Sequence, residues 1–204
     1  MKTKIIIVRH AECFGNIENK LSGITDFELT LTGMVQIKKL ASRLEDEKIE
    51  KIYSSPLKRA KKTANGIAEK LNITNIIENE NLIEINYGEC DGMTWEEIDD
   101  KYPKIRGEWK EKNHYPIGIP GQEPYADLQK RITNEIIKLA NENLGKTICI
   151  VSHGIAIGSF MCYVHGLPFE KVNEIPAISN TGVNILEYEN GEFKIIIEAD
   201  DSHL

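Results

Sequence analysis

Three short polar motifs of this chain carry side chains suited to holding a small anion. They are Arg9-His10, Ser54-Ser55-Pro56 with Arg59 shortly after it, and Ser152-His153-Gly154, and each follows a short apolar run. A guanidinium group makes paired hydrogen bonds to phosphate oxygens, and the amino end of a helix presents free N–H groups to them. If the three motifs lie together, the residues predict a binding site for a phosphate-like anion.

Each of these residues also has an ordinary structural explanation. A histidine at the end of a strand is more often a hydrogen-bonded structural residue than a catalyst, and Lys58, Lys61 and Lys62 are typical of a solvated helix face. Arg59 differs because its place in the first turn of a helix directs it back toward the strand end. No catalytic role is predicted for the remaining histidines, which are His114, His165 and His203.

Strands and helices are predicted to alternate around the motifs. Strands are expected over 4–8, 51–53, 73–77, 147–151, 183–188 and 193–197, and helices over 34–44, 56–71, 125–143 and 154–164. Ser55 is the expected N-cap of the second helix, with Pro56 at its first position. This alternation predicts an α/β fold of one domain over 1–204, a three-layer α/β/α sandwich with a mostly parallel sheet. Because ligands of such sheets bind outside the carboxyl ends of the strands, the three motifs are expected to meet there.

The composition restricts the partners and the location of the protein. The chain has 204 residues, with 25 Lys and Arg against 32 Asp and Glu, so its formal net charge is −7. An acidic protein is a poor match for nucleic acid or an anionic membrane, although a few arginines in one cleft still bind a small anion. No apolar run approaches the roughly 18 residues of a membrane span, and a cytoplasmic protein is predicted. The cysteines, without a CxxC spacing, indicate neither a disulfide framework nor a zinc ribbon; they are Cys13, Cys90, Cys149 and Cys162.

The polar motifs belong to a longer series of sequence blocks. The series is VRHAE at 8–12, Asn16, Ser22-Gly23, LTLTG at 29–33, SSPLKRAKKTA at 54–64, LIEINYGECDGMTWEEI at 82–98, PGQE at 120–123 and VSHG at 151–154. In this order and spacing the series resembles the histidine phosphatase superfamily, in its phosphoglycerate-mutase-like branch. The resemblance covers nearly the whole chain. It implies the phosphoglycerate-mutase-like form of the three-layer sandwich.

The resemblance also implies roles for individual residues. His10 matches the nucleophile that forms a phosphohistidine, and Glu84 matches the proton donor, which the residues alone could not single out among many acids. The residues implied to hold the phosphoryl group or to line the pocket are Arg9, Arg59, His153, Asn16, Ser22, Gly23 and Gly154. The implied activity is the hydrolysis of a small phosphomonoester, with no metal and no cofactor, because the arginines supply the countercharge.

The chain departs from the family pattern at two blocks. The usual RHGET reads Arg9-His10-Ala11-Glu12-Cys13, and the usual PGGES reads Pro120-Gly121-Gln122-Glu123-Pro124. Neither change removes an implied catalytic group. The segment after Glu84 is compact and lacks the extra cationic segment of the mutases, so a phosphatase is predicted rather than a cofactor-dependent phosphoglycerate mutase.

Two alternatives come from other classes of protein. His10, Glu84 and His153 could form a metal site of two histidines and one carboxylate, although the neighbouring arginines would repel a cation. A non-catalytic module that binds a phosphorylated ligand would use the same residues. The sequence leaves the oligomeric state open and does not choose among phosphosugars, phosphoserine, the nucleotide-loop phosphate of cobamide synthesis and phosphoglycerates. The variable region 86–122 is expected to decide the substrate.

Overall fold

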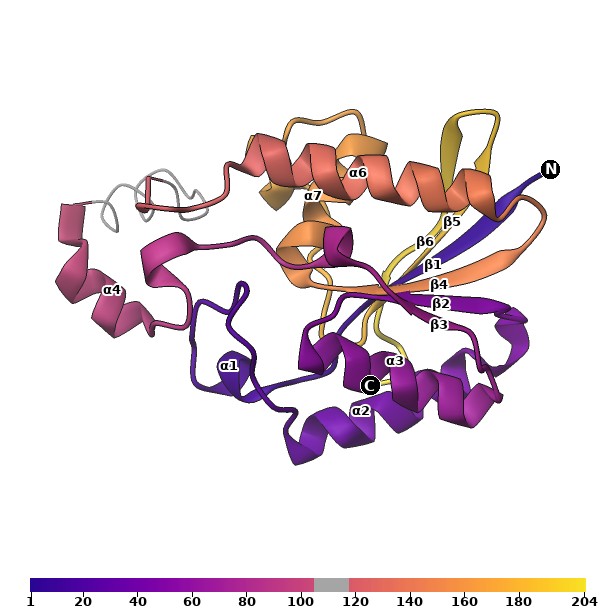
Figure 1. Cartoon of the computed structure of the whole chain (residues 1–204), viewed down its shortest axis with the longest axis horizontal. Coiled ribbons are helices and arrows are strands. Elements are labelled where there is room, and N and C mark those ends of the chain that lie inside the picture. The colour runs from indigo at the N-terminus through magenta and orange to yellow at the C-terminus, as the bar shows by residue number, and fades with distance from the viewer. Residues whose placement is uncertain (105–117) are drawn as a thin grey trace.

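A six-stranded sheet forms the centre of the computed structural model, which describes residues 1–104 and 118–204 (Figure 1). The strands are β1 (Thr3–Arg9), β2 (Lys51–Ser54), β3 (Ile76–Glu78), β4 (Thr147–Ser152), β5 (Val183–Glu189) and β6 (Glu192–Asp200). Their order is β3-β2-β4-β1-β5-β6. The first four strands of this order run parallel to one another, whereas β5 is antiparallel to both β1 and β6. The predicted mostly parallel sheet is confirmed.

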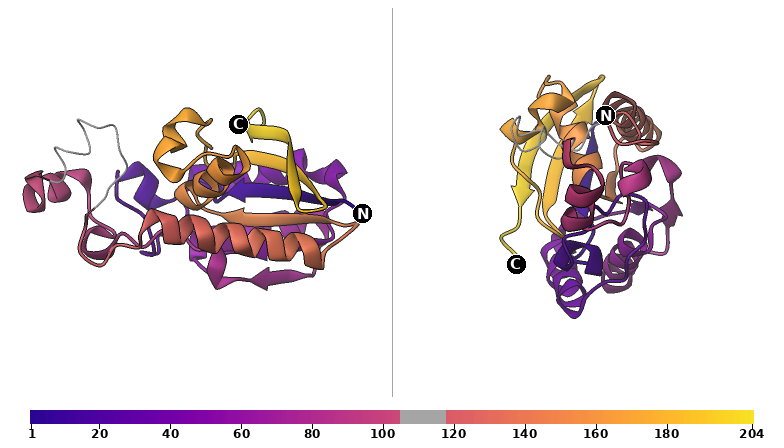
Figure 2. Two further views of the ribbon diagram at one scale, coloured as in Figure 1. Left: turned by 90° about the horizontal axis from the view of Figure 1, so that it is seen from above. Right: turned by 90° about the vertical axis from the view of Figure 1, so that its left-hand side faces the viewer.

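Helices cover both faces of this sheet (Figures 1 and 2). One face carries α2 (Leu31–Arg43) and α3 (Lys58–Leu71), and the other carries α6 (Tyr125–Glu142) and α7 (Gly154–Val164). The predicted three-layer α/β/α sandwich is therefore also confirmed. The shorter helices are α1 (Phe14–Ile17), α4 (Trp95–Lys101) and the 3₁₀ turns η1 (Glu45–Glu47), η2 (Glu80–Leu82), η3 (Gly88–Cys90) and η4 (Phe169–Glu174).

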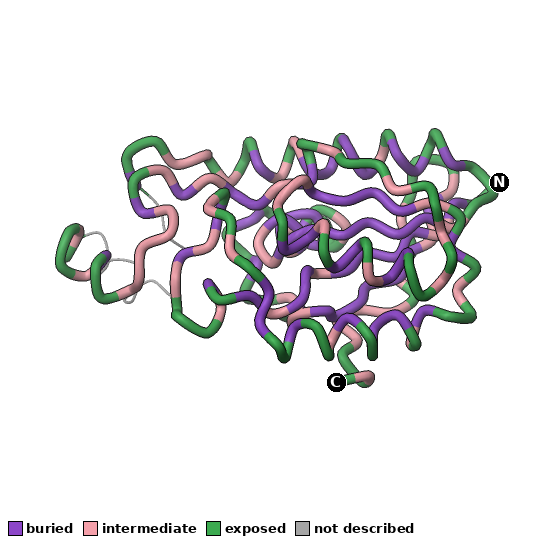
Figure 3. Tube along the Cα trace, turned by 60° about the horizontal axis from the view of Figure 1, so that its bottom comes forward, coloured by how far each residue is buried: buried purple, intermediate pink, exposed green. Residues whose placement is uncertain are grey.

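The central strands are apolar on both faces because helices bury both faces. Ile5 and Ile7 of β1 pack in the core formed with α6 and α7, whereas Ile6 and Val8 pack in the core formed with α2 and α3. Figure 3 follows these strands as continuous buried segments, while the helices alternate between buried and exposed positions. The sheet is thus a rigid support whose parallel strands end together at one edge.

Two predicted helix starts differ from the structure. α2 begins three residues early, because Thr30 caps it by accepting a hydrogen bond from the Gly33 N–H at 3.0 Å. α3 begins at Lys58 rather than Pro56, since Leu57 still has an extended backbone. The Ser55 hydroxyl accepts from the Leu57 N–H at 3.3 Å but does not cap the helix itself.

The remaining elements lie close to their predicted places. The Asn-Gly signal forms the expected two-residue turn between β5 and β6, with φ of 54° at Asn190 and 89° at Gly191. Glycine accepts such a backbone without strain, and asparagine tolerates it. β3 is shorter than predicted and lies at the edge of the sheet. No helix of the described residues is long and apolar enough to span a bilayer, and all four cysteines are free and buried.

Candidate active site

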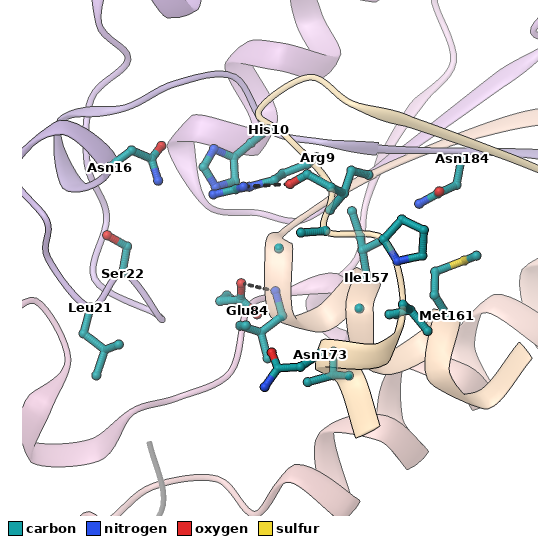
Figure 4. Close-up of a pocket in the computed structure, with 18 of the residues that line it drawn as sticks. Arg9, His10, Asn16, Leu21, Ser22, Glu84, Ile157, Met161, Asn173 and Asn184 are labelled. Carbon is teal, nitrogen blue, oxygen red and sulfur yellow. Dashed lines mark hydrogen bonds between the residues drawn. The ribbon is translucent and has the colours of Figure 1, made fainter. Parts of the chain in front are cut away.

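A cavity of about 390 Å³ opens where β1 and β4 end and α7 begins (Figure 4). Six of the nine residues predicted for the site line it, namely Arg9, His10, Asn16, Ser22, Glu84 and Gly154. The other three, Gly23, Arg59 and His153, are buried beside it. The structure therefore brings the whole predicted set together at the carboxyl edge of the parallel strands.

His10 directly follows β1 and is almost fully buried. Its Nδ1 lies 2.8 Å from the carbonyl oxygen of Ala11. A carbonyl only accepts hydrogen bonds, so Nδ1 carries the ring proton and the free lone pair is on Nε2. Burial, and then the charges of Arg59 and Arg9, lower the pKa of His10 well below its usual value. The ring is therefore neutral, with the lone pair of Nε2 free of this bond.

Arg59 is fully buried and organises a loop around the site. Its Nη1 donates to the Thr25 carbonyl at 2.8 Å, and its Nη2 donates to the carbonyls of Gly23 at 2.6 Å and Ser22 at 3.3 Å. Its Nε has no acceptor among the described residues. The guanidinium thus holds the 22–25 loop through Nη1 and Nη2, and its Nε–H remains available to another acceptor. Arg9 is anchored at 2.8 Å by the carbonyl of Ile178.

His153 directly follows β4 as the N-cap residue of α7, and 5.2 Å separate the centroids of its ring and the His10 ring. Its Nε2 lies 2.8 Å from the hydroxyl of Ser55, and its buried Nδ1 has no partner within the described chain. Burial, followed by the charge of Arg59, lowers the pKa of this histidine as well. Both histidines are consequently neutral at neutral pH.

The carboxylate of Glu84 lies at the amino end of α7, which Figure 4 shows below His10. Oε1 accepts from the N–H groups of Ile85 and Ala156, each at 2.9 Å, and Oε2 accepts from that of Ile155 at 3.0 Å. Burial nevertheless raises the pKa of Glu84, against the opposing effect of these bonds and of Arg59. The site therefore combines neutral bases with a carboxyl group inclined to keep its proton.

The smaller predicted residues differ in how they take part. Asn16 lines the cavity, and its Oδ1 is held by the Cys13 N–H at 3.0 Å and the Asn180 amide at 3.2 Å. Ser22 also lines it. Gly23 does not, but a methyl group there would lie 2.2 Å from Oδ2 of Asp91. The absence of a side chain at Gly23 thus leaves room for the Asp91 carboxylate, and the Gly23 carbonyl accepts a hydrogen bond from Arg59.

Comparison with known proteins identifies the family. The sequence profile of the histidine phosphatase superfamily (branch 1) matches residues 5–201. The chain belongs to the histidine phosphatase superfamily. This membership confirms the predicted resemblance and class of enzyme, a phosphoric monoester hydrolase.

Relatives of this histidine phosphatase are similar over most of their length. Phosphoserine phosphatase 1 of Hydrogenobacter thermophilus is 34% identical over 168 residues, which are 82% of this chain and 79% of that protein. A metal-independent phosphoserine phosphatase of Arabidopsis thaliana is 28% identical over 204 residues, covering 99% and 83%. The solved structure of Bacillus stearothermophilus YhfR has a TM-score of 0.91 at 28% identity and covers 98% of both chains.

Several contacts that support the phosphatase site were not predicted from the sequence. Ser55 holds His153, and Asp91 accepts from the N–H groups of Ile24 at 2.9 Å and Thr25 at 2.7 Å. Arg131 donates to the carbonyl of Ile83 at 3.1 Å and thereby supports the segment that carries Glu84. Asp91 lies inside one of the family blocks, but only its contacts reveal its part in holding the 22–25 loop.

The alternative metal site was also compared with the structure. No group of three or more His, Cys, Asp or Glu side chains in the described ranges is arranged to hold a metal ion. His10 and Glu84 make hydrogen bonds to the backbone, and His153 bonds to a hydroxyl.

The remaining histidines either do not line the cavity or fall outside the described residues. His165 follows α7 and bonds to Glu198 at 2.7 Å, and His203 bonds to Thr181 at 3.1 Å. His114 and part of the expected specificity region 86–122 lie outside the described residues.

Proposed function

We propose that this enzyme hydrolyses phosphomonoesters of small metabolites through a phosphohistidine at His10, without metal or cofactor. The observation that carries the proposal is the state of the His10 ring, whose Nδ1–H donates to Ala11 at 2.8 Å and leaves the lone pair on Nε2. A neutral nitrogen with a free lone pair is the nucleophile that attack on phosphorus needs. Arg9 and Arg59 beside it compensate the charge of the phosphoryl oxygens.

The phosphoryl group is assigned to buried donors around His10. Nε of Arg59 and Nδ1 of His153 both lack an acceptor in the described part of the chain. For His153 this assignment places the ring proton on Nδ1, and the Ser55 hydroxyl then donates to Nε2 across 2.8 Å. Donors that are fixed before the reaction stabilise developing charge without the cost of reorienting solvent.

In the first step, Nε2 of His10 bonds to phosphorus while the bond from phosphorus to the ester oxygen breaks. Glu84 gives its proton to the departing alkoxide, and we assign that proton to Oε2, since Oε1 already accepts two backbone N–H groups. In the second step, water attacks phosphorus and Glu84 takes up its proton. The phosphorus–nitrogen bond breaks, which releases inorganic phosphate and restores neutral His10.

The substrate is proposed to be a small phosphorylated metabolite, and phosphoserine is named for both phosphatase relatives described above. We further propose that the enzyme acts on neither nucleic acid nor membrane and works as a single domain over 1–204. The cytoplasmic location stays a prediction.

The direct test separates a phosphatase from a mutase. The purified enzyme should release inorganic phosphate from p-nitrophenyl phosphate and from phosphoserine, with little interconversion of 2- and 3-phosphoglycerate. Isomerisation of phosphoglycerate much faster than phosphate release would instead identify a mutase. No phosphate release from any phosphomonoester would favour a non-catalytic binding module.

A further inference from the structure

The cavity continues from the catalytic residues into an apolar extension, which we call the inner arm. In Figure 4, Ile157, Met161 and Asn184 lie on the opposite side of His10 and Glu84 from Asn16 and Ser22. The inner arm consists of Ile157, Met161, Pro176, Ala177, Ile178 and Asn184, contributed by α7, β5 and the segment after η4. The whole cavity, at about 390 Å³, falls within the range of about 300–1,000 Å³ typical of small-molecule sites.

Asn184 is a polar exception in this apolar arm. It is only 2% exposed, and it pairs with Ile7 of β1, whose side chain packs in the core formed with α6 and α7. Its Oδ1 accepts from the Ala199 N–H at 2.7 Å, which fixes the orientation of the amide. No described residue accepts a hydrogen bond from its Nδ2, although the side chain lines the cavity. Because Nδ2 borders the cavity and is not sealed in the packed interior, it can donate to a ligand atom there.

The charges of the lining indicate what kind of acceptor fits. Among the described residues that line the cavity, the cations are Arg9 and Lys20. Arg9 belongs to the phosphoryl site. Lys20 is paired with Glu18 at 2.6 Å and directly precedes Leu21, which Figure 4 shows on the side of the cavity opposite the inner arm. Arg9 also reaches the inner arm, because its Nη1 donates to the Ile178 carbonyl at 2.8 Å, so a carboxylate there would compete with the phosphoryl group for this one cation. A neutral oxygen does not compete in this way.

We propose that the inner arm binds the alcohol part of the substrate and that Nδ2 of Asn184 donates to a neutral oxygen at its far end. The preferred substrate class is then a phosphomonoester of an alcohol with a short apolar segment that ends in a carbonyl, amide or hydroxyl oxygen. This inference rests on the proposed phosphatase function and adds the substrate class to it.

The first test uses the wild-type enzyme and a series of alkyl phosphates from methyl to n-butyl. Burial of each added methylene in the inner arm should raise kcat/KM about two- to fourfold. A flat series overturns the inner arm as a substrate site. If the enzyme also fails to hydrolyse p-nitrophenyl phosphate, the proposed function itself has failed, so the two failures are distinguishable.

The second test compares n-butyl phosphate with the ester that carries a terminal amide, in wild type and in Asn184→Asp. Aspartate keeps the acceptor for the Ala199 N–H but removes the donor, so the ratio of kcat/KM for the amide over the plain ester should fall about five- to tenfold. Asn190→Asp, in the exposed turn of the same hairpin, adds the same charge and is the matched control. An unchanged ratio in folded Asn184→Asp, or a preference for phosphoserine over the amide, overturns the proposal. If Asn184→Asp does not fold, the wild-type series decides.

Discussion

At the scale of single residues, burial pushes the pKa values of the site in opposite directions. His10 and His153 lose affinity for protons in the apolar surroundings, whereas Glu84 gains it. Burial thus favours the neutral form of all three groups, which is the combination that the proposed attack by His10 and proton donation by Glu84 would use. His10 could be nominated from its position after a strand, but Glu84 could not, because its burial and its contact with α7 are invisible in a sequence rich in glutamates.

The role of Glu84 can be tested by the leaving group. Glu84→Gln should slow hydrolysis of an alkyl phosphate by about 10²–10⁴-fold, because the alkoxide then departs without a proton. Phosphorylation of His10 by p-nitrophenyl phosphate should be slowed much less, since that phenolate leaves without help. The quantity to measure is the burst of p-nitrophenol, which reports the first step alone.

Arg59→Lys is the control for this comparison. Lysine keeps the charge but lacks the guanidinium N–H groups that bind the 22–25 loop and are assigned to the phosphoryl group. Hydrolysis of the alkyl and of the aryl phosphate should therefore be impaired alike. If Glu84→Gln suppresses the aryl burst as strongly as alkyl turnover, Glu84 positions the site and another acid is the donor.

At the scale of elements, the strand ends were predictable and the loop that completes the site was not. Periodicity and β-branched runs are local signals, so β1, β4 and α7 were found within a residue of their bounds. The 22–25 loop is held by Arg59 and by Asp91, which are distant in sequence. No local pattern reveals such contacts. The contact of the Ser55 hydroxyl with His153 is equally distant in sequence and equally absent from any local pattern.

Gly23→Ala tests whether this loop supports catalysis. The added methyl would lie 2.2 Å from Oδ2 of Asp91 and 2.3 Å from the carbonyl oxygen of Ile85, so the loop must move. We expect about 1–3 kcal/mol of destabilisation in urea unfolding. We also expect a raised KM, because the carbonyl of Gly23 anchors Arg59.

Ser22→Ala serves as the comparison within the same loop. It removes a hydroxyl that donates to the Lys20 carbonyl at 3.1 Å and adds no volume, so its cost should be about 1 kcal/mol or less. Equal effects of the two substitutions on stability and on KM would argue against a tightly packed 22–25 loop.

At the scale of the whole molecule, two buried histidines at the carboxyl edge of the sheet link stability to pH. Their lowered pKa values mean that the folded chain binds fewer protons than the unfolded chain below about pH 6.5. Protonation of these histidines therefore favours the unfolded chain. Their contribution to the free energy of unfolding is fully present above that pH and is lost as the pH falls. Glu84 acts in the opposite sense, because its raised pKa favours the folded state at low pH.

Replacement of His153 isolates its contribution to the pH dependence of the free energy of unfolding. Between pH 7.5 and 5.5 each buried histidine that stays neutral should lower the free energy of unfolding by about 1.4 kcal/mol. His153→Gln should therefore lose about that much less than wild type over the same interval, and the Glu84 contribution cancels in the comparison. Urea unfolding at the two pH values measures the difference. Identical losses would mean that His153 is protonated in the folded state.

The most direct test of the account is to trap the phosphoenzyme. Rapid quenching during turnover of p-nitrophenyl phosphate should yield one phosphoryl group on His10, linked through Nε2, because Nδ1 is engaged by the Ala11 carbonyl. A phosphohistidine is labile in acid and stable in alkali, and it should be absent from His10→Ala. A phosphoryl group that survives acid, lies on another residue or persists in His10→Ala would contradict the central claim.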